Sequence, residues 1–240
     1  MSTHPPSRSF ARTETRFITF DCFGTLIDWE SGIHQFVHTW LERHGRSDSR
    51  ANMLLHYAAF EPEAQLGQYR SYREILAAVM HRFAHEYRID LAAGEEHQLA
   101  ESIRNWPPFP DTADALRRLA ASYGIIILTN IDRDLFEGTR VQLPPVLSGV
   151  ITSEDVQSYK PAHRHFLAAF DAYRCGPENI VHAAESLYHD IMPCKELGIP
   201  HVWVNRRGKV MGAGATRSAL VQPDAEVGSL TELADRVLAP

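Results

Sequence analysis

Cysteine is scarce in this chain of 240 residues, which contains three. Cys22, Cys175 and Cys194 lie far apart and form no CxxC pair, so the sequence favours neither a disulfide framework nor a zinc site. Basic residues are not in excess either. The net charge of −6 and the pI near 6.1 argue against a nucleic-acid partner, which usually requires a basic face.

Long apolar runs are also missing, so we expect no membrane span. Residues 1–16 contain no apolar stretch, and we expect them to form a flexible polar leader rather than a secretory signal. Together these absences predict a cytoplasmic protein. The 44% of apolar residues is ample for one α/β core with a smaller inserted unit.

What the chain does contain is a series of short apolar runs that read as buried parallel strands. FITF at 17–20 ends abruptly at Asp21, and GIIILTN at 124–130 ends on polar residues. Further strands are expected at 149–152, 179–184 and 200–205. Helical patterns that separate them lie at 111–123, 161–174 and 190–197. This alternation predicts an α/β fold with a doubly wound parallel sheet.

Residues 31–106 carry helical rather than strand patterns and are too long for a crossover between neighbouring strands. We therefore expect an inserted helical cap domain here, on a core domain of residues 17–30 and 107–240. Four helices are expected within the insertion and at its edges, at 32–45, 49–64, 69–89 and 94–106. The proline-rich WPPFPD at 106–111 would stiffen the return to the core.

Polar residues follow the expected strands. Ligands bind at the carboxyl ends of the strands in such sheets, which places Asp21, Thr129, Asn130 and Glu185 where chemistry can occur. A carboxylate directly after a buried strand suits a nucleophile, although an aspartate can also cap the turn that follows. Threonine and asparagine are common turn formers too.

Four short motifs then occur in a fixed order: FDCFGTLID at 20–28, LTN at 128–130, SYKP at 158–161 and ESLYHD at 185–190. They resemble the four motifs of the haloacid dehalogenase superfamily, and are most similar to its type II, or L-2-haloacid, dehalogenase group. The resemblance covers nearly the whole chain beyond residue 16. It implies a Rossmann-like core, a helical cap and a hydrolase that works through a covalent ester.

The resemblance assigns the nucleophile to Asp21, which would attack the substrate and form the ester. Lys160 matches the superfamily lysine whose ammonium lies beside the nucleophile and holds it ionised, although a lysine before a proline can also be solvated surface. Thr25 would offer its hydroxyl to the same carboxylate. Asp190 aligns with the aspartate that helps to position water for hydrolysis of the ester.

The same resemblance implies a small substrate pocket. Thr129 would anchor the carboxylate of the substrate, and Asn130 would help to receive the halide. Phe23, with its neighbour Cys22, would line the apolar side of the pocket. Phosphatases of the superfamily carry a second aspartate in place of Phe23, and because a phenyl ring has no acid-base chemistry, Phe23 argues against a phosphatase.

The fourth motif departs from the dehalogenase pattern, which has serine and asparagine where Glu185 and Leu187 stand. If the protein were a phosphatase, Asp21, Glu185 and Asp190 could bind Mg²⁺, which prefers oxygen ligands. We favour a charge-balanced network without a metal. His189 would contact the substrate, and as a group that titrates near neutrality it could activate water, although a chain with 13 histidines can also place one there by chance.

The cap should supply a cation for the leaving group or for the substrate carboxylate. The neighbourhood of the family arginine contains no arginine after Arg50, which leaves Arg70 and Arg73 as candidates. A guanidinium fork suits a carboxylate well. A solvated helix face explains these two arginines equally well.

The sequence therefore predicts hydrolytic displacement at the alpha carbon of a small 2-substituted carboxylic acid, without a cofactor and with a halide as leaving group. One alternative is ring opening of azetidine-2-carboxylate, in which Glu185 would pair with the substrate ammonium. Others are a Mg²⁺-dependent phosphatase and a non-catalytic binding module. The expected partner is the small-molecule carboxylate, and a homodimer is compatible with the sequence.

Overall fold

The computed structural model describes residues 14–208 and 219–239. Residues 1–13 of the expected leader therefore lie outside the described residues. Arg16, just before the first strand, is already tied to the sheet, because its backbone N–H donates to the carbonyl oxygen of Asn179 at 2.8 Å.

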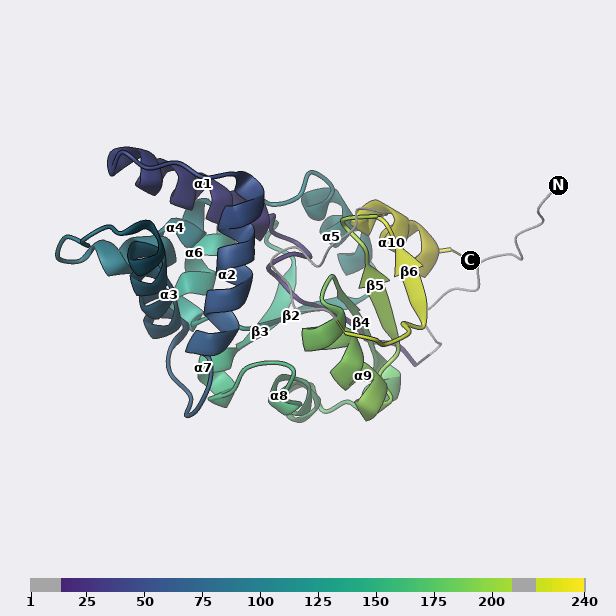
Figure 1. Cartoon of the computed structure of the whole chain (residues 1–240). Coiled ribbons are helices and arrows are strands. Elements are labelled where there is room, and N and C mark those ends of the chain that lie inside the picture. The colour runs from purple at the N-terminus through teal and green to yellow at the C-terminus, as the bar shows by residue number, and fades with distance from the viewer. Residues whose placement is uncertain (1–13, 209–218, 240) are drawn as a thin grey trace.

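Parallel strands in the described part of the chain form one six-stranded sheet in the order β3-β2-β1-β4-β5-β6 (Figure 1). The strands are β1 (Phe17–Phe20), β2 (Gly124–Thr129), β3 (Leu147–Thr152), β4 (Ile180–Ala184), β5 (His201–Val204) and β6 (Ala225–Val227). β1 pairs with β2 on one side and with β4 on the other. The strand order reverses between β1 and β4, and such a switch point is where open α/β sheets bind ligands.

Helices cover both faces of the sheet, with α5 and α10 on one face and α8 and α9 on the other (Figure 1). The elements outside the insertion are α5 (Thr112–Ala120), α6 (Arg133–Arg140), α7 (Ser153–Val156), α8 (Arg164–Tyr173), η3 (Pro177–Asn179), η4 (Leu187–Ile191), α9 (Met192–Leu197) and α10 (Leu230–Val237). Alternate residues of β2 pack on opposite faces of the sheet. Ile125 and Ile127 belong to the same hydrophobic cluster as Leu116, and Ile126 belongs to the same cluster as Phe166. This double burial explains why β2 is apolar at successive positions.

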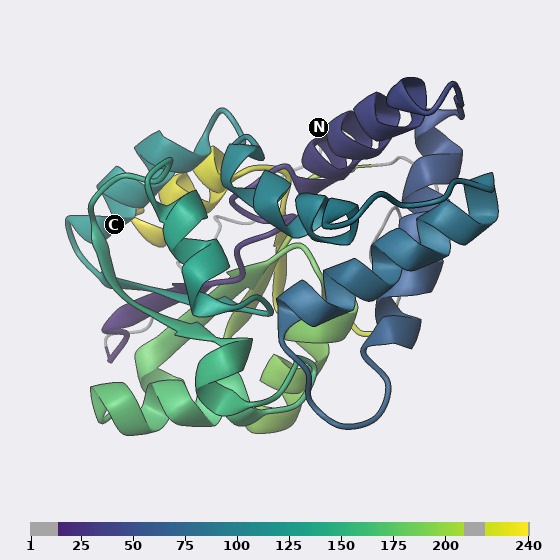
Figure 2. The same ribbon diagram turned by 90° about the vertical axis from the view of Figure 1, so that its left-hand side faces the viewer.

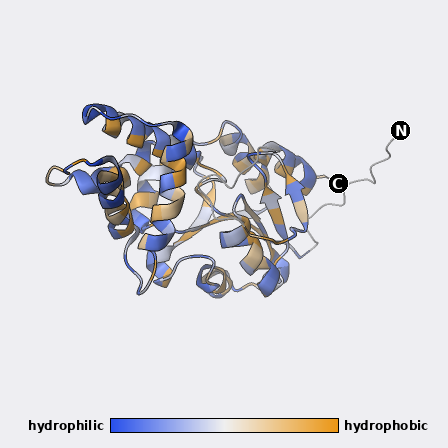
Figure 3. Ribbon diagram, viewed as in Figure 1, coloured by the Kyte–Doolittle hydropathy of each residue, from blue (hydrophilic) through white to orange (hydrophobic). Residues whose placement is uncertain are grey.

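The chain between β1 and α5 forms helices at the carboxyl-end side of the sheet (Figures 1 and 2). They are α1 (Trp29–Arg43), α2 (Arg50–Ala64), α3 (Tyr72–Tyr87), η1 (Glu95–His97), α4 (Gln98–Ser102) and η2 (Ile103–Asn105). Helix α3 begins with a capping box, in which Ser71 and Glu74 satisfy each other's backbone N–H groups. These helices mix hydrophobic and hydrophilic residues (Figure 3), and the buried positions of α1, α2 and α3 are apolar or aromatic.

Two short segments join these helices to the core, and they run side by side. Ile27 and Pro108 form an antiparallel bridge. The N–H of Asp28 donates to the carbonyl oxygen of Pro107 at 2.8 Å, and the N–H of Phe109 donates to that of Leu26 at 3.0 Å. The exit and the return of the chain are thus hydrogen-bonded to each other.

A buried carboxylate also ties helix α3 to the core. Asp132 lies between β2 and α6 and is 3% exposed. Its Oδ1 accepts the N–H of Tyr72 at 2.8 Å and its Oδ2 accepts the N–H of Arg73 at 2.9 Å. Because the first N–H groups of a helix have no partner within the helix, this core aspartate completes the start of α3.

The α/β fold with a parallel sheet confirms the expectation from the sequence, and the first strand lies at the expected residues. Two details were wrong. The helix expected at 94–106 is broken into η1, α4 and η2, and α6, β6 and α10 were not foreseen. Within the described residues, no helix is long and apolar enough to cross a membrane.

Candidate active site

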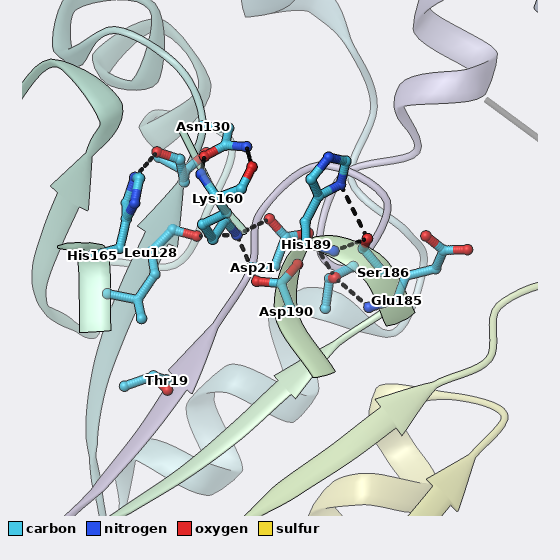
Figure 4. Close-up of polar contacts among 12 residues, drawn as sticks. Thr19, Asp21, Leu128, Asn130, Lys160, His165, Glu185, Ser186, His189 and Asp190 are labelled. Atoms are coloured by element: carbon cyan, nitrogen blue, oxygen red, sulfur yellow. Dashed lines mark hydrogen bonds and ion pairs between the residues drawn. The ribbon is translucent and has the colours of Figure 1, made fainter. Parts of the chain in front are cut away.

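Asp21 follows β1 directly, and its carboxylate meets the ammonium group of Lys160 (Figure 4). Lys160 Nζ donates to Asp21 Oδ1 at 2.9 Å, to Asp190 Oδ1 at 2.7 Å and to the carbonyl oxygen of Leu128 at 2.8 Å. Lys160 is 2% exposed, Asp21 7% and Asp190 0%. The expected proximity of Lys160 and Asp21 is confirmed, and solvated surface is excluded for this lysine.

One ammonium group thus lies between two buried carboxylates. Burial lowers the pKa of Lys160, but Asp190 and Asp21 outweigh it, so this pKa is raised and the lysine stays charged. For Asp190, burial opposes ionisation, while Lys160 and His182 hold its pKa below the usual range. Burial raises the pKa of Asp21, against the opposing effect of Lys160, and the negative charge of Asp190 raises it further. Asp190 is therefore the more firmly ionised of the two carboxylates.

The other oxygen of Asp21 is oriented by a threonine. Thr25 Oγ1 donates to Asp21 Oδ2 at 2.9 Å and accepts the N–H of Glu185 at 2.9 Å. Gly24, in the turn between Asp21 and Thr25, has φ +96°, a region that favours glycine. Both carboxylate oxygens of Asp21 therefore have a fixed donor, and the side chain is held in one orientation.

A buried histidine contacts Asp190, and the sequence analysis did not identify it. His182, on β4, is 0% exposed, and its Nε2 lies 3.1 Å from Asp190 Oδ1. Its Nδ1 lies 2.8 Å from Thr19 Oγ1. Since a carboxylate only accepts, Nε2 carries the proton and Nδ1 accepts from Thr19. Burial lowers the pKa of His182, in keeping with this neutral form.

A cavity of about 250 Å³ opens above this cluster. Seven of the residues expected at the site line it: Asp21, Phe23, Thr129, Asn130, Lys160, His189 and Asp190. Phe23 packs edge-on against Trp106, with ring centroids 5.8 Å apart, and makes part of an apolar wall. The cavity is therefore lined both by aromatic rings and by the charged side chains of Asp21, Lys160 and Asp190.

The two polar residues after β2 have different surroundings. Thr129 Oγ1 is buried and has no hydrogen-bond partner in the described part of the chain. Asn130 is engaged with the backbone of Lys160, because its Oδ1 accepts the Lys160 N–H at 2.7 Å and its Nδ2 donates to the Lys160 carbonyl at 3.1 Å. Asn130 thus fixes the peptide that carries the buried lysine.

Four of the residues expected to contact a substrate do not line this cavity. Arg73 pairs with Asp134 at the surface, and Arg70 donates to the carbonyl oxygen of Ala64. Cys22 is fully buried, and its burial raises the thiol pKa well above the usual range. Glu185 points away from Asp21 (Figure 4), and its backbone N–H donates to Thr25 Oγ1.

The alternative magnesium site is not assembled. Within residues 14–208 and 219–239, no three histidine, cysteine or acidic side chains are placed to hold a metal ion. Asp190 Oδ1 is already bonded to Lys160 and His182, and the carboxylate of Glu185 lies away from Asp21 (Figure 4). Asp21, Glu185 and Asp190 therefore do not fit Mg²⁺ in this arrangement.

The wall of the cavity on the side of the helical insertion was also missed by sequence reasoning. It is formed by the following side chains: Trp29, Glu61, Pro62, Gln65, Leu66, Tyr72 and Trp106. Glu61 Oε1 accepts from Tyr72 Oη at 3.4 Å, and burial raises the pKa of Glu61 to about 7. The sequence did contain a signal for the inward position of Glu61, because Glu61 follows the buried Tyr57 by one helical turn.

The loop after β4 supplies the remaining side of the cavity. Ser186 Oγ accepts the N–H of His189 at 2.9 Å and lies 3.1 Å from its Nδ1. His189 therefore lies in the middle of η4 with its ring held beside Ser186, the residue that caps this helix. This places an imidazole in the cavity wall.

Comparisons with known proteins agree with this arrangement. A family model for haloacid dehalogenase-like hydrolases matches residues 15–198. An (S)-2-haloacid dehalogenase of Pseudomonas fluorescens is 27% identical over 221 residues, which cover 90% of this chain and 93% of that protein. An (S)-2-haloacid dehalogenase of Pseudomonas putida is 28% identical over 229 residues, 92% of this chain and 97% of the relative.

A solved structure shows the same fold. The L-2-haloacid dehalogenase from Xanthobacter autotrophicus, with chloropropionic acid covalently bound, aligns with a TM-score of 0.78 at 17% sequence identity. The alignment covers 93% of this chain and 98% of that one. At this identity the likeness concerns the fold, and the chemistry has to be argued from the residues of the cavity.

Proposed function

Since the chain belongs to the haloacid dehalogenase-like hydrolases, we propose that it displaces a halide from the alpha carbon of a small 2-haloacid. The names of the relatives indicate this substrate class. The observation that carries the proposal is the Asp21 carboxylate, which lines the cavity and is fixed by Thr25 and Lys160. Phe23 stands where an acid for phosphate chemistry would be needed.

In the first step, one oxygen of Asp21 attacks the alpha carbon. A carbon–oxygen bond forms, the carbon–halogen bond breaks, and the halide leaves with the bonding electron pair. Asp21 loses its charge in the ester, while Lys160 keeps its ion pair with Asp190 at 2.7 Å. The buried ammonium is therefore never left without a counter-charge.

In the second step, water attacks the ester carbonyl of Asp21. Lys160, 2.9 Å from Asp21 Oδ1, stabilises the negative charge that develops on that carboxyl group. Asp190 Oδ2 has no partner among the described residues and can orient the water. Cleavage of the ester then returns the Asp21 carboxylate and releases a 2-hydroxy acid, with the attacking water supplying the new oxygen on Asp21.

Binding of the substrate carboxylate falls to Thr129, because its hydroxyl lacks a partner and its side chain lines the cavity. Residues 31–106 act as the cap over a core of residues 17–30 and 107–240. Trp29 and Trp106 lie where these two parts join and line the cavity with aromatic surface. The substrate is then enclosed away from bulk water, which favours attack by a carboxylate.

A cytoplasmic location belongs to the same proposal. Cys22, Cys175 and Cys194 are all free thiols, and a reducing compartment preserves that state.

Turnover of (S)-2-chloropropionate, followed as chloride release with and without chelator, tests the proposal. We expect chelator to have no effect and Asp21→Asn to lower the rate by at least about a thousandfold, because the nucleophile is lost. The matched control is Asp114→Asn, an exposed aspartate outside the cavity, which should keep the native rate. Chelator-sensitive hydrolysis of p-nitrophenyl phosphate, with no chloride release, would contradict the proposal.

A further inference from the structure

The cavity contains a carboxylate that the proposed chemistry does not use. Glu61, on α2, lines the cavity from the side opposite the core, and its Oε1 accepts from Tyr72 Oη and from Gln65 Nε2. Its Oε2 has no partner in the part of the chain that the structure describes. A side chain that lines the cavity thus keeps one acceptor atom without a donor.

Within the described residues, no lysine or arginine that lines the cavity contacts Glu61. Of the lysines and arginines in residues 14–208 and 219–239, only Lys160 lines the cavity, and its three donors are taken by Asp21, Asp190 and Leu128. Arg82, which pairs with Glu63 of the same helix α2, lies at the surface and does not line the cavity. A partly buried carboxylate without a counter-ion is costly unless a ligand supplies one.

The surroundings of Glu61 suit a cation. Tyr72, Tyr159, Trp29 and Trp106 line the same cavity, and Tyr72 and Tyr159 lie with ring centroids 6.2 Å apart. The faces of aromatic rings attract ammonium groups, most strongly where water is excluded. A carboxylate acceptor among such rings is the chemistry that recognises a small organic ammonium ion.

We propose that Glu61 binds an ammonium group wherever a 2-substituted carboxylic acid carries one, so that the cavity binds zwitterionic acids in preference to acids that carry the carboxylate alone. The inference rests on the proposed function, because the reacting carbon must lie over Asp21 while the ammonium meets Glu61 Oε2. Azetidine-2-carboxylate, whose ring nitrogen is protonated at neutral pH, belongs to this class. Glu61 thereby takes the role that the sequence suggested for Glu185.

The protonation of Glu61 gives the proposal a pH dependence. Burial raises its pKa to about 7, so it changes charge in the neutral range. The phenols that face it, Tyr57, Tyr72 and Tyr159, have pKa values raised by burial and stay neutral there. Across the cavity stand Asp21, Lys160, Asp190 and His189. Ionised Glu61 binds a cation better, so preference for an ammonium ligand should increase from pH 6 to pH 8.

A pair of four-membered-ring acids tests this directly. Azetidine-2-carboxylate and cyclobutanecarboxylate share ring size and carboxylate, and only the former carries an ammonium group. Binding of each is measured by calorimetric titration in an Asp21→Asn background, which prevents turnover. We expect the ring amine to bind about tenfold tighter or more, as for a hydrogen bond to a charged group. Glu61→Gln should abolish the preference.

Glu63→Gln is the matched control, because Glu63 lies on the same helix but is surface-exposed and pairs with Arg82. It should leave the preference intact. Equal binding of the two acids, binding of neither, or a preference that survives Glu61→Gln would overturn the inference. If Glu61→Gln does not fold, a preference that fails to grow between pH 6 and pH 8 overturns it as well. Chloride release tests the proposed function separately, so the two failures can be told apart.

Discussion

Lys160 is the residue on which the charge balance of the cavity depends. Its ammonium carries a formal charge of +1 between two buried carboxylates that it contacts at 2.9 Å and 2.7 Å. Removing one partner of a buried ion pair leaves uncompensated charge, which is more costly than the pair itself was stabilising. Here both Asp21 and Asp190 would be left uncompensated at once.

Lys160→Met should therefore lower the free energy of unfolding by about 3–5 kcal/mol and abolish chloride release. Urea denaturation and the rate with (S)-2-chloropropionate measure the two effects. The double variant Lys160→Met/Asp190→Asn removes one of the two uncompensated carboxylates. Part of the lost free energy of unfolding should therefore return, while chloride release should not. An unchanged urea midpoint for Lys160→Met would show that the carboxylates are not held by this lysine.

His182 acts on the reaction through Asp190 and is a positioning residue. His182→Leu removes the donor to Asp190 Oδ1, and we expect kcat to fall about tenfold or more with little change in KM. Because His182 lowers the pKa of Asp190, the acid limb of the pH–rate profile should move to higher pH. His182→Gln keeps a side-chain donor and should restore both. A profile that does not move in the leucine variant would leave His182 with a packing role alone.

The site residues differ in how far the sequence reveals them. Asp21 could be predicted because it directly follows a buried strand, and Lys160 because the short motif that contains it resembles one of the family. His182 could not, since a histidine within the apolar run of β4 looks like any buried polar residue. Glu61 comes into the cavity through the packing of α2 over the core, and the local sequence does not specify that packing.

Among the elements, helix α3 depends on a residue of the core for its first turn. Asp132→Ala leaves the N–H groups of Tyr72 and Arg73 without partners, and we expect a loss of about 1–2 kcal/mol in unfolding free energy, as for a lost helix cap. Tyr72 lines the cavity, so KM should rise as well. Denaturation and steady-state kinetics measure these effects.

Asp134→Ala is the control for Asp132→Ala. Asp134 pairs with Arg73 but its side chain is 58% exposed, and an exposed ion pair contributes about 0–1 kcal/mol. The two variants remove the same chemical group two residues apart. If the two variants lowered the free energy of unfolding equally, the hydrogen bonds that Asp132 accepts from the backbone of Tyr72 and Arg73 would not be what stabilises the start of α3.

The elements were predictable where burial is complete. β1, β2 and β4 are apolar at nearly every position because both faces of the sheet are covered, so their runs stand out. β6 has three residues, one of them Glu226, at the edge of the sheet, and so short a run gives no periodic signal. The helix expected at 94–106 is interrupted by the 3₁₀ turns η1 and η2. An apolar pair three residues apart fits either kind of helix, so the pattern did not reveal the interruption.

At the scale of the whole molecule, a parallel sheet and a set of helices meet around one cavity (Figure 1). The segments that follow the strands contribute the charged groups, Asp21, Lys160 and Asp190, which are fixed by buried hydrogen bonds. The helices contribute aromatic rings and Glu61. Reactivity and selectivity are therefore assigned to different parts of the chain, and a change in α2 or α3 can alter the preferred substrate without moving Asp21 or Lys160.

The paired segments around Ile27 and Pro108 limit how these two parts can move. Since the outgoing and returning backbones are hydrogen-bonded to each other, neither segment can shift without displacing the other. Phe23 and Trp106 flank these segments, contact each other and line the cavity. The same backbone pairing therefore fixes both the path of the chain into the helices and the aromatic surface beside the nucleophile.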